Sequence, residues 1–450
     1  MKTKILFPIL LAMLTLTGCD DFLDITPTGK VIAETADEYR SLLSYEYHYF
    51  AKDRYMTTIR TDEVLMDPAK SSSDDKDAYL DLWRWQDDTP SETTTYFSWR
   101  TYYHTLYIAN YVIEHQKKIT NGTSEEISQL VGEAYMMRAY THFLLVNLYA
   151  EPYTHCNPVT TRGVPMQLKA DVTAVLGCAS VDSVYKQVLN DISEAEKYLN
   201  VETWEVGKNY RFNKVSAQAL RARTNLYMGK WNEALTAAKA VLAINNKLEN
   251  LNNSKALLPN SFKSVENIVA LERFSSNMSK VIYYPSLDFF NKYRTGDKRR
   301  TVFYERVEDP YWALKKGYNE ELACSFRTAE FYLTAAEAAA RLGELEEAIG
   351  FLSPLMEKRL TSSAYKTAKA LIDEMTQEEL IQEIMDERAR ELAFEGHRWY
   401  DLRRTTRPTL THVYEGVTYT LSPEQYTMRF PADAVAANPE IERWEYNTEK

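Results

Sequence analysis

Apolar side chains recur at helical spacing along most of the chain, and polar capping sequences mark where several helices begin. Capping boxes of the form T-x-x-E start at Thr35, Thr123 and Thr376, where a threonine and a glutamate can satisfy free backbone N–H groups. The apolar period of about 3.6 after each box predicts three helices, covering about 35–50, 123–150 and 376–396. The same spacing predicts two more helices, at 96–118 and 184–199.

The second half of the 123–150 helix is apolar nearly all round, from Ala134 to Tyr149. This pattern is typical of a helix that is buried inside a protein. His142 lies within it, and we interpret it as a core histidine rather than a metal ligand.

Two segments, 213–244 and 327–358, share small residues, then a glycine, then an alanine five positions later. Gly229 and Gly343 are the glycines, and they lie 114 positions apart, so the two copies are not in tandem. Alanine lets two helices approach closely and glycine fits a tight turn between them. The pattern resembles a tetratricopeptide helical hairpin, and the chain is therefore predicted to be mainly α.

Two stretches lack this periodicity. Residues 67–98 are polar and punctuated by proline, so we interpret them as a long ordered loop or insertion. Residues 245–326 are rich in Tyr, Asn and Ser and separate the two hairpin segments. After Pro408 the chain alternates in short pieces, with a predicted β-hairpin turn at Glu415-Gly416.

The N-terminus has the features of a targeting segment. Lys2 and Lys4 precede an apolar run from Ile5 to Leu16, which is too short to span a bilayer as a stable helix. The sequence LTGC, ending at Cys19, resembles a bacterial lipobox. Residues 1–18 are then a lipoprotein signal peptide and Cys19 is the lipid-attachment residue, whereas an ordinary signal peptide with a chance cysteine is the alternative.

Composition and charge narrow the classes of function. The chain has 53 basic and 64 acidic residues, a net charge of −11, and its longest basic cluster is 298–300. These values argue against a nucleic-acid-binding role, which normally requires a basic patch. The 32 tyrosines either pack the core or bind a ligand. Beyond Cys19 three cysteines remain, and pairing of Cys156 with Cys178 stays open.

The strongest resemblance to a known family lies near the C-terminus. Residues 387–404 read ERARELAFEGHRWYDLRR, which is similar to a signature of the SusD/RagB family of outer-membrane lipoproteins. The lipobox followed by CDDFLD, and the segments 99–110, 132–139 and 326–339, match the family in order along the chain. The tail after Arg429 reproduces the family ending only in part.

This resemblance implies a SusD-like fold, with a tetratricopeptide-like helical-repeat scaffold, long irregular loops and a few short strands. Residues 19–450 would form one domain, with loop-rich insertions at about 67–98 and 245–326. Members cap a TonB-dependent SusC-like barrel transporter and capture glycans, or peptides in some members, at the cell surface. The acidic residues that follow Cys19 resemble a surface-export signal of Bacteroidetes lipoproteins. The resemblance implies a lipid-anchored outer-membrane protein that is not an enzyme.

Three alternatives remain open at this stage: a surface glycoside hydrolase, a peptide-binding member of the family, and a helical scaffold that binds only the barrel. Glu387, Glu391, Glu395 and His397 could suggest acid–base chemistry. However, a spacing of four places the glutamates on one helix face beside Arg388, Arg390 and Arg398, which favours a structural ion network. We predict no catalytic residue, no metal site and no cofactor. Calcium at Asp74, Asp75 and Asp77 is less favoured than a solvated acidic loop.

Candidate ligand residues are aromatic and polar side chains in the two loop-rich segments. Sugars present apolar C–H faces that stack on aromatic rings, and hydroxyl groups that hydrogen bond to polar side chains. Aromatic residues at core spacing in helices, including Trp99, Tyr140, Tyr227, Trp231 and Trp399, are set aside as packing. The remaining candidates are Tyr79, Asp81, Trp83, Trp85, Tyr283, Tyr284, Tyr311 and Trp312.

Overall fold

The computed structural model describes residues 33–69, 73–87, 90–273, 284–309, 311–317 and 321–441, without the side chains of Asp74 and Asp75. The chain divides into two compact units, Met1–Glu34 and Thr35–Lys450. The predicted signal peptide and Cys19 lie outside the described residues. Within the described ranges, every helix falls short of the length or the hydropathy that a bilayer crossing requires.

Helices dominate the first half of the second unit. The elements in order are α2 (Ala36–Tyr49), α3 (Met56–Ile59), β1 (Val64–Leu65), α4 (Ser73–Trp83), α5 (Trp99–His115), η2 (Gln116–Lys118), α6 (Ser124–Tyr149), η3 (Tyr153–His155), β2 (Arg162–Pro165), β3 (Cys178–Ser180), α7 (Val181–Tyr198), α8 (Lys214–Tyr227) and α9 (Trp231–Ile244).

Short strands and small helices come next, followed by a second set of longer helices. These elements are β4 (Asn267–Val269), β5 (Tyr284–Pro285), α10 (Leu287–Phe290), α11 (Arg299–Val302), β6 (Tyr304–Glu308), β7 (Tyr311–Leu314), β8 (Phe326–Arg327), α12 (Thr328–Leu342), α13 (Leu345–Arg359), α14 (Ser362–Ile372), α15 (Gln377–Glu391), α16 (Arg398–Arg404), β9 (Leu410–Tyr414), β10 (Val417–Leu421), η4 (Pro423–Tyr426) and α17 (Ala432–Ala437).

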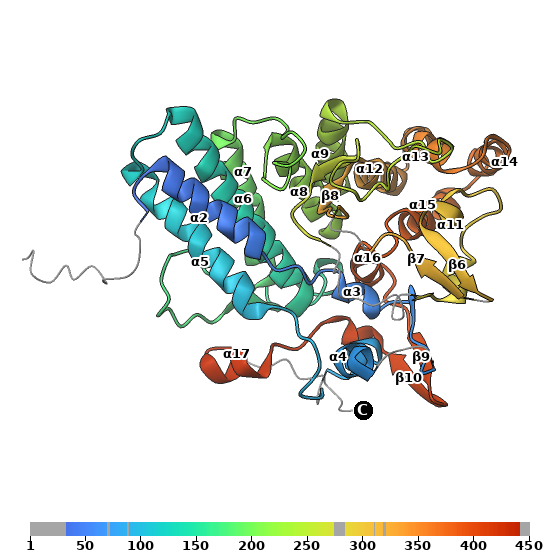
Figure 1. Ribbon diagram of the computed structural model, residues 1–450, viewed down its shortest axis with the longest axis horizontal. Coiled ribbons are helices and arrows are strands. Elements are labelled where there is room, and N and C mark those ends of the chain that lie inside the picture. Colours follow the sequence, from blue (N-terminus) through green and yellow to red (C-terminus); the bar gives the residue numbers. More distant parts are fainter. Residues whose placement is uncertain are drawn as a thin grey trace, which may run out of the picture. The chain divides into compact units, whose positions relative to one another are not determined.

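The longer helices pack in succession, each against the next (Figure 1). Helix α5 contacts α6, α6 contacts α7, and the series continues through α8 and α9 to α12 and α13. The predicted capping boxes form at Thr35, Thr123 and Thr376, where each side chain accepts a hydrogen bond from the backbone of the third helical residue. The mainly α, repeat-like scaffold predicted from periodicity is confirmed.

The two hairpins predicted from the repeat pattern are α8–α9 and α12–α13. Gly229 and Gly343 make their turns with φ of 71° and 86°, a left-handed conformation that glycine adopts without strain. Helices α9 and α12 pack against each other, so the hairpins are neighbours in space although the insertion separates them in sequence. Alanines such as Ala234 and Ala336 are fully buried, which permits this close approach.

The first loop-like segment is partly helical, which corrects the prediction for 67–98. Helix α4 occupies Ser73–Trp83, and its N-terminal part reads SDDKDA, a polar run without clear apolar periodicity. Tertiary packing of its last turn replaces the missing pattern, because Leu82 and Trp83 are buried. The expected helix from 376 also ends earlier than predicted, at Glu391 rather than near Gly396.

Short antiparallel strands organise the 245–326 segment, and one of their pairings joins it to the start of the unit. β4 pairs with β8, β6 pairs with β7, and β5 pairs with β1, all antiparallel. The β1–β5 pairing places Leu65 opposite Tyr284 and joins two segments more than two hundred residues apart. The predicted hairpin around Glu415-Gly416 is also present as β9–β10.

The signature 387–404 makes a sharp change of direction between α15 and α16. Phe394 and Gly396 both have positive φ, 60° and 69°. A Cβ atom on Gly396 would lie 2.7 Å from the backbone oxygen of Arg54. Glycine is therefore required here by conformation and by space.

Two predictions about single residues are settled by the structure. His142 is fully buried, and burial with the nearby Arg138 charge lowers its pKa to about 3, as expected for a neutral core histidine. The pairing of Cys156 and Cys178 that the sequence left open is absent, since both are free thiols.

Two glycine substitutions should change stability in opposite directions. Gly343→Ala should lower the free energy of unfolding by about 1–2 kcal/mol, because alanine is strained at φ of 86°. Gly350→Ala, inside α13 with open space around the added Cβ, should raise it by about 0.5–1 kcal/mol. Urea denaturation of each variant measures the difference, and a stabilised Gly343→Ala variant would contradict the left-handed turn.

Candidate functional site

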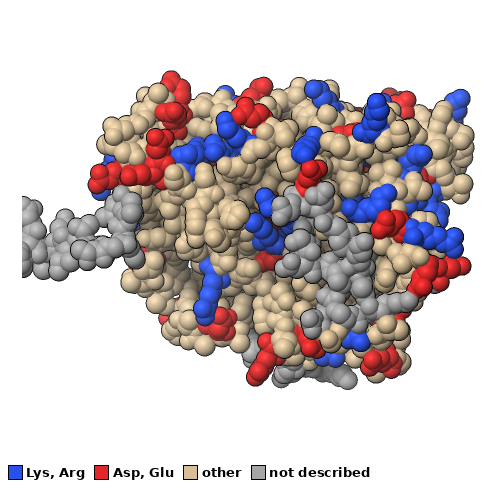
Figure 2. Space-filling model, in the orientation of Figure 1, with Lys and Arg blue, Asp and Glu red and all other residues tan. Residues whose placement is uncertain are grey.

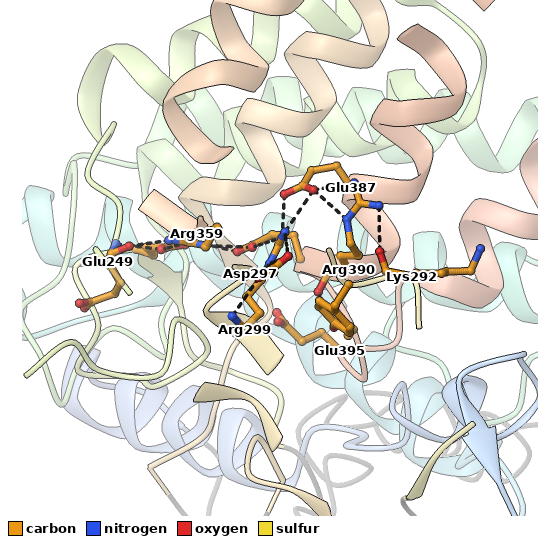
Figure 3. Close-up of polar contacts among 12 residues, drawn as sticks. Glu249, Lys292, Asp297, Arg299, Arg359, Glu387, Arg390 and Glu395 are labelled. Carbon is orange, nitrogen blue, oxygen red and sulfur yellow. Dashed lines mark hydrogen bonds and ion pairs between the residues drawn. The ribbon is translucent and has the colours of Figure 1, made fainter. Parts of the chain in front are cut away.

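The glutamates of the signature lie in a buried ion network rather than in a catalytic cleft (Figure 3). Glu387, Glu391 and Glu395 are each at most 1% exposed. Arg299 from α11 contacts both Glu387 (2.7 Å) and Glu391 (3.0 Å). Arg359 at the end of α13 lies 2.8 Å from Glu391. The predicted structural role of these carboxylates is confirmed.

More cations and acids complete this network. Arg327 joins Glu391 (2.7 Å) to Glu395 (2.8 Å), and the ammonium of Lys316 also contacts Glu395. Glu266, which directly precedes β4, forms an ion pair with Arg359 at 2.6 Å. We call this set the signature network: Glu266, Asp297, Arg299, Lys316, Arg327, Arg359, Glu387, Arg390, Glu391 and Glu395.

Charge compensation decides the protonation of these glutamates. Burial alone would raise the pKa of Glu391, but the charges of Arg359 and Arg327 outweigh it and hold the pKa well below its ordinary value. The pKa of Glu395 is lowered in the same way, by Arg327 and Lys316 against the effect of burial. Ionised, paired and enclosed carboxylates of this kind cannot donate a proton near neutral pH.

The partners inside the signature differ from the prediction in two of three cases. Arg390 does pair with Glu387, at 2.8 Å. Arg388 instead pairs with Asp401 (3.0 Å) and Arg398 with Asp62 (2.8 Å). The main partners of the glutamates come from outside the signature, which helical spacing alone could not reveal.

The tryptophans of the first candidate segment are packed against the C-terminal hairpin. His412 of β9 lies between the rings of Trp83 and Trp85, with centroid distances of 4.1 and 4.3 Å. Both indole N–H groups donate to backbone oxygens, those of Val64 and Arg60, at 3.0 Å. Both residues are at most 3% exposed. Their ring faces are covered by protein, so a ligand at the surface does not reach them in this state.

Tyr79 and Asp81 lie on the same helix, α4, and are also buried. The carboxylate of Asp81 accepts hydrogen bonds from the backbone N–H of Ser91 and the hydroxyl of Thr94, both at 2.7 Å. Burial would raise the pKa of Asp81, but these hydrogen bonds and Arg84 lower it below the ordinary value. Asp81 is thus a buried anchor of the following loop.

The second candidate segment forms a partly exposed aromatic cluster. Tyr283 lies outside the described residues, whereas Tyr284 is buried and packs its ring 5.1 Å from that of Tyr311. The hydroxyl of Tyr311 donates to the carboxylate of Asp67, which the β1–β5 pairing brings close. Trp312 stacks on Phe290 instead, at 4.6 Å. We call Tyr284, Tyr311 and Asp67 the tyrosine cluster, and Trp312 stands apart from it.

A cleft of about 830 Å³ opens beside the first candidate segment, between the start of α5, the end of α4 and the chain that precedes α17. Its volume lies within the range usual for small-molecule sites. The residues that line it include Asp81, Gln86, Asp87, Thr94, Tyr96, Phe97, Trp99, Arg100, Tyr149, Met428, Arg429, Phe430 and Asp433.

Among the aromatic residues that line the cleft, Tyr96 is the most exposed. Its side chain is 52% exposed, and no aromatic ring in the described part of the chain stacks on it. Trp99, which the sequence analysis set aside as packing, is half-buried and both packs and lines the cleft, since it contacts Tyr149 and Phe430 edge-on. Trp99 is the first residue of α5, and Tyr96 lies three positions before it, outside the helix that the sequence predicted to begin near Tyr96.

Charged side chains stand at the rim of the cleft. Arg100 and Asp433 pair at 3.1 Å, with side chains that are 85% and 57% exposed. A smaller pocket of about 420 Å³ shares Trp99 and both of these residues. Nothing in the sequence around Asp433 marked it as a site residue, because the C-terminal segment reaches the cleft only through tertiary packing.

A metal site is not formed by the described residues, in which no group of His, Cys, Asp and Glu is arranged to hold an ion. The calcium alternative involved Asp74 and Asp75, whose side chains lie outside the described residues.

Comparisons with known proteins agree on one family. Residues 21–226 match the family model described as starch-binding associating with outer membrane (SusD-like_3), and residues 273–445 match that of the SusD family (SusD_RagB). The chain is similar to SusD-like protein P38 of Formosa agariphila, with 25% identity over 90% of this chain and 91% of the relative.

Solved structures show the same fold. A SusD superfamily protein from Bacteroides thetaiotaomicron superposes with a TM-score of 0.73 at 21% identity, covering 92% of this chain and all of the other. A SusD-like carbohydrate binding protein from Bacteroides vulgatus gives 0.70 at 18% identity, covering 90% and 97%. A laminarin binding SusD-like protein gives 0.65 at 17% identity, covering 91% and 99%.

Neutralising the central glutamate of the signature network should lower the free energy of unfolding strongly. Glu391→Gln leaves the buried Arg327 and Arg359 without full compensation, and removing one partner of such a network costs about 3–5 kcal/mol. Glu378→Gln, exposed in the first turn of the same helix, is the matched control and should change stability by less than about 0.5 kcal/mol. Urea denaturation at neutral pH measures both.

Acid should act on the same carboxylates. A lowered pKa in the folded state stabilises the protein fully above about pH 4.3, the ordinary glutamate pKa, and this stability is lost as pH falls below it. Glu391→Gln should therefore lose less stability than the wild type between pH 6 and pH 3. Equal losses in the two proteins would contradict the assignment.

Proposed function

Because the chain belongs to the SusD/RagB family, we propose that it is a glycan-binding protein of the outer-membrane surface. In this proposal it captures an oligosaccharide or polysaccharide and delivers it, uncleaved, to a TonB-dependent SusC-like transporter. The family description as starch-binding supports a glycan as the ligand. The carbohydrate-binding and laminarin-binding neighbours share the fold and support the same class.

The exposure of Tyr96 in the cleft is the observation that carries the proposal. A pyranose ring has an apolar face that can stack on an exposed tyrosine, while its hydroxyl groups need polar partners. Gln86, Arg100 and Asp433 line the same cleft and can supply donors and acceptors. We therefore place the main ligand contacts in this cleft.

The tyrosine cluster and Trp312 remain a second candidate surface. Tyr311 and Trp312 are only half-buried, so parts of both rings are open to a ligand. Tyr311, however, already donates to Asp67, and Trp312 already stacks on Phe290, which leaves less free surface than Tyr96 has.

A hydrolase is less well supported by the acids of the cleft. A general acid for glycoside cleavage needs a raised pKa so that it is protonated at neutral pH. The pKa of Asp81 is lowered, and Asp87 is held by both nitrogens of Arg60 at 2.7 Å. These groups suit positioning and hydrogen bonding, which supports capture without cleavage.

Family membership and the lipobox at Cys19 support a lipid anchor and a transporter partner as part of this proposal. Three acyl chains, as bacterial lipoproteins carry, hold a protein firmly to a membrane, whereas one chain does so only marginally. Purification of the tagged chain from outer membranes, with a barrel transporter as the expected companion, tests the partnership.

Truncating Tyr96 should weaken glycan binding. Tyr96→Ala should lower the affinity for laminarin or starch oligosaccharides by about tenfold, since it removes an exposed stacking face from the cleft. Tyr45→Ala is the control, because Tyr45 is similarly exposed (57%) and does not line the cleft. Isothermal titration calorimetry measures the affinities.

Other outcomes of this titration discriminate between the alternatives. Loss of affinity in Trp312→Ala but not in Tyr96→Ala would move the site to the second candidate surface. New reducing ends after incubation with the wild type would establish a hydrolase, and binding of peptides but of no glycan would establish a peptide-binding member.

The anchor should depend on one cysteine. Cys19→Ser should abolish incorporation of labelled palmitate and move the protein from the membrane to the soluble fraction, because the thiol that accepts the lipid is gone. Cys156→Ser is the matched control and should leave both unchanged. A Cys19→Ser protein that stays labelled and membrane-bound would show that the lipid is attached elsewhere.

A further inference from the structure

A small polar pocket of about 230 Å³ lies where the chain leaves α2, separate from the cleft. Its lining includes three basic residues, His48, Lys52 and Arg273, together with Ser44 and Tyr210. None of the residues that line the pocket is acidic. The pocket is thus a basic site on a chain whose net charge is −11.

The local sequence explains why the acids are missing. Lys52 is followed by Asp53 and Arg273 is preceded by Glu272, but both acids are 4% exposed and turn into the protein. There the carboxylate of Glu272 forms an ion pair with the guanidinium of Arg54, at 3.5 Å. The chain therefore directs its acids inward and its bases outward at both positions.

The two cations also lack counter-charges. No hydrogen bond or ion pair joins the side chain of Lys52 or of Arg273 to another residue in the described ranges. Burial lowers the pKa of Lys52, and repulsion by the charge of Arg273 lowers it further. Figure 2 shows basic side chains gathered near the middle of the drawn face, beside the segment that links α2 to α3 in Figure 1.

We infer that this pocket binds an oxyanion, namely the sulfate ester or carboxylate of an acidic sugar. Guanidinium presents a planar fork of donors that matches such a group, and the ammonium of Lys52 adds a point charge. The volume is below that of whole small-molecule sites, which suits one substituent of a glycan whose remainder lies outside. The identity of the ligand as a sugar rests on the proposed function, whereas the oxyanion site does not.

The local charge is sufficient although the whole protein is acidic. At physiological ionic strength the field of a charge is screened over about 8 Å, so distant carboxylates affect the pocket little. The pocket would therefore select acidic over neutral saccharides without making the protein a general binder of polyanions.

The test removes both charges and compares three probes. Lys52→Gln/Arg273→Gln should bind oligogalacturonate or a sulfated oligosaccharide about tenfold more weakly than the wild type, and a neutral laminarin oligosaccharide equally well. Lys208→Gln/Arg306→Gln is the matched control, since it makes the same change in net charge at exposed side chains outside the pocket. Calorimetry measures the affinities, and the acidic probe that loses affinity identifies the anion.

Inorganic sulfate separates failure of the pocket from failure of the proposed function. At equal ionic strength, sulfate should raise the melting temperature of the wild type and of the control. The rise should be smaller in the Lys52→Gln/Arg273→Gln variant, which lacks both charges of the pocket. An equal rise in all three proteins, or equal binding of the acidic probes, would overturn the oxyanion site. If sulfate acts as expected but no glycan binds, the site stands and the glycan-binding function falls.

Discussion

The structure depends on the burial of Glu391 among three arginines that come from different parts of the chain. Arg299 belongs to the insertion, Arg327 ends β8 directly before α12, and Arg359 ends α13. Removing a charge from water costs several kcal/mol, and the cost is recovered only when the partners are in place with good geometry. Displacing either the insertion or the second hairpin would therefore leave a buried charge of the network without its partner. This constraint couples an irregular segment to a regular scaffold.

That coupling explains how a segment of short strands can hold its half-buried aromatic side chains in fixed positions. Asp297 and Arg299 anchor one part of the insertion, and Lys316 anchors another against Glu395. Between these anchors β6 and β7 form a two-stranded sheet with each other and, in the described ranges, with no third strand, so their ladder fixes little beyond the hairpin. Tyr311 and Trp312 lie on β7 and are held by the ends of the segment more than by its strands.

The sequence predicted what depends on local pattern and missed what depends on distant contacts. Three capping boxes and two glycine turns were recognisable because the responsible residues lie within a few positions of each other. Helix α4 was missed because its polar first turns carry no periodicity and its end is stabilised by His412, more than three hundred residues away. For the same reason Trp83 and Trp85 looked like ligand residues in a loop, although their partner is a distant strand. Asp433 and Phe430, which line the cleft, gave no local signal.

The exposure of each tyrosine, rather than its position in the sequence, shows whether its ring packs the core or is open to a ligand. In the described part of the chain, the large apolar side chains that stay well exposed include three tyrosines, Tyr45, Tyr49 and Tyr96, and no tryptophan or phenylalanine. Tyr45 and Tyr49 cover each other, with ring centroids 4.2 Å apart. Most aromatic rings are thus consumed in packing, where the phenolic hydroxyl of residues such as Tyr47 and Tyr140 satisfies a buried glutamate. Tyrosine is used here because a mainly α core with many buried charges needs apolar rings that can also donate a hydrogen bond. Tyr96 is instead 52% exposed, in a cleft whose lining combines apolar side chains with polar ones such as Gln86 and Arg100. An exposed ring beside hydrogen-bonding groups is suited to stacking on the apolar face of a sugar.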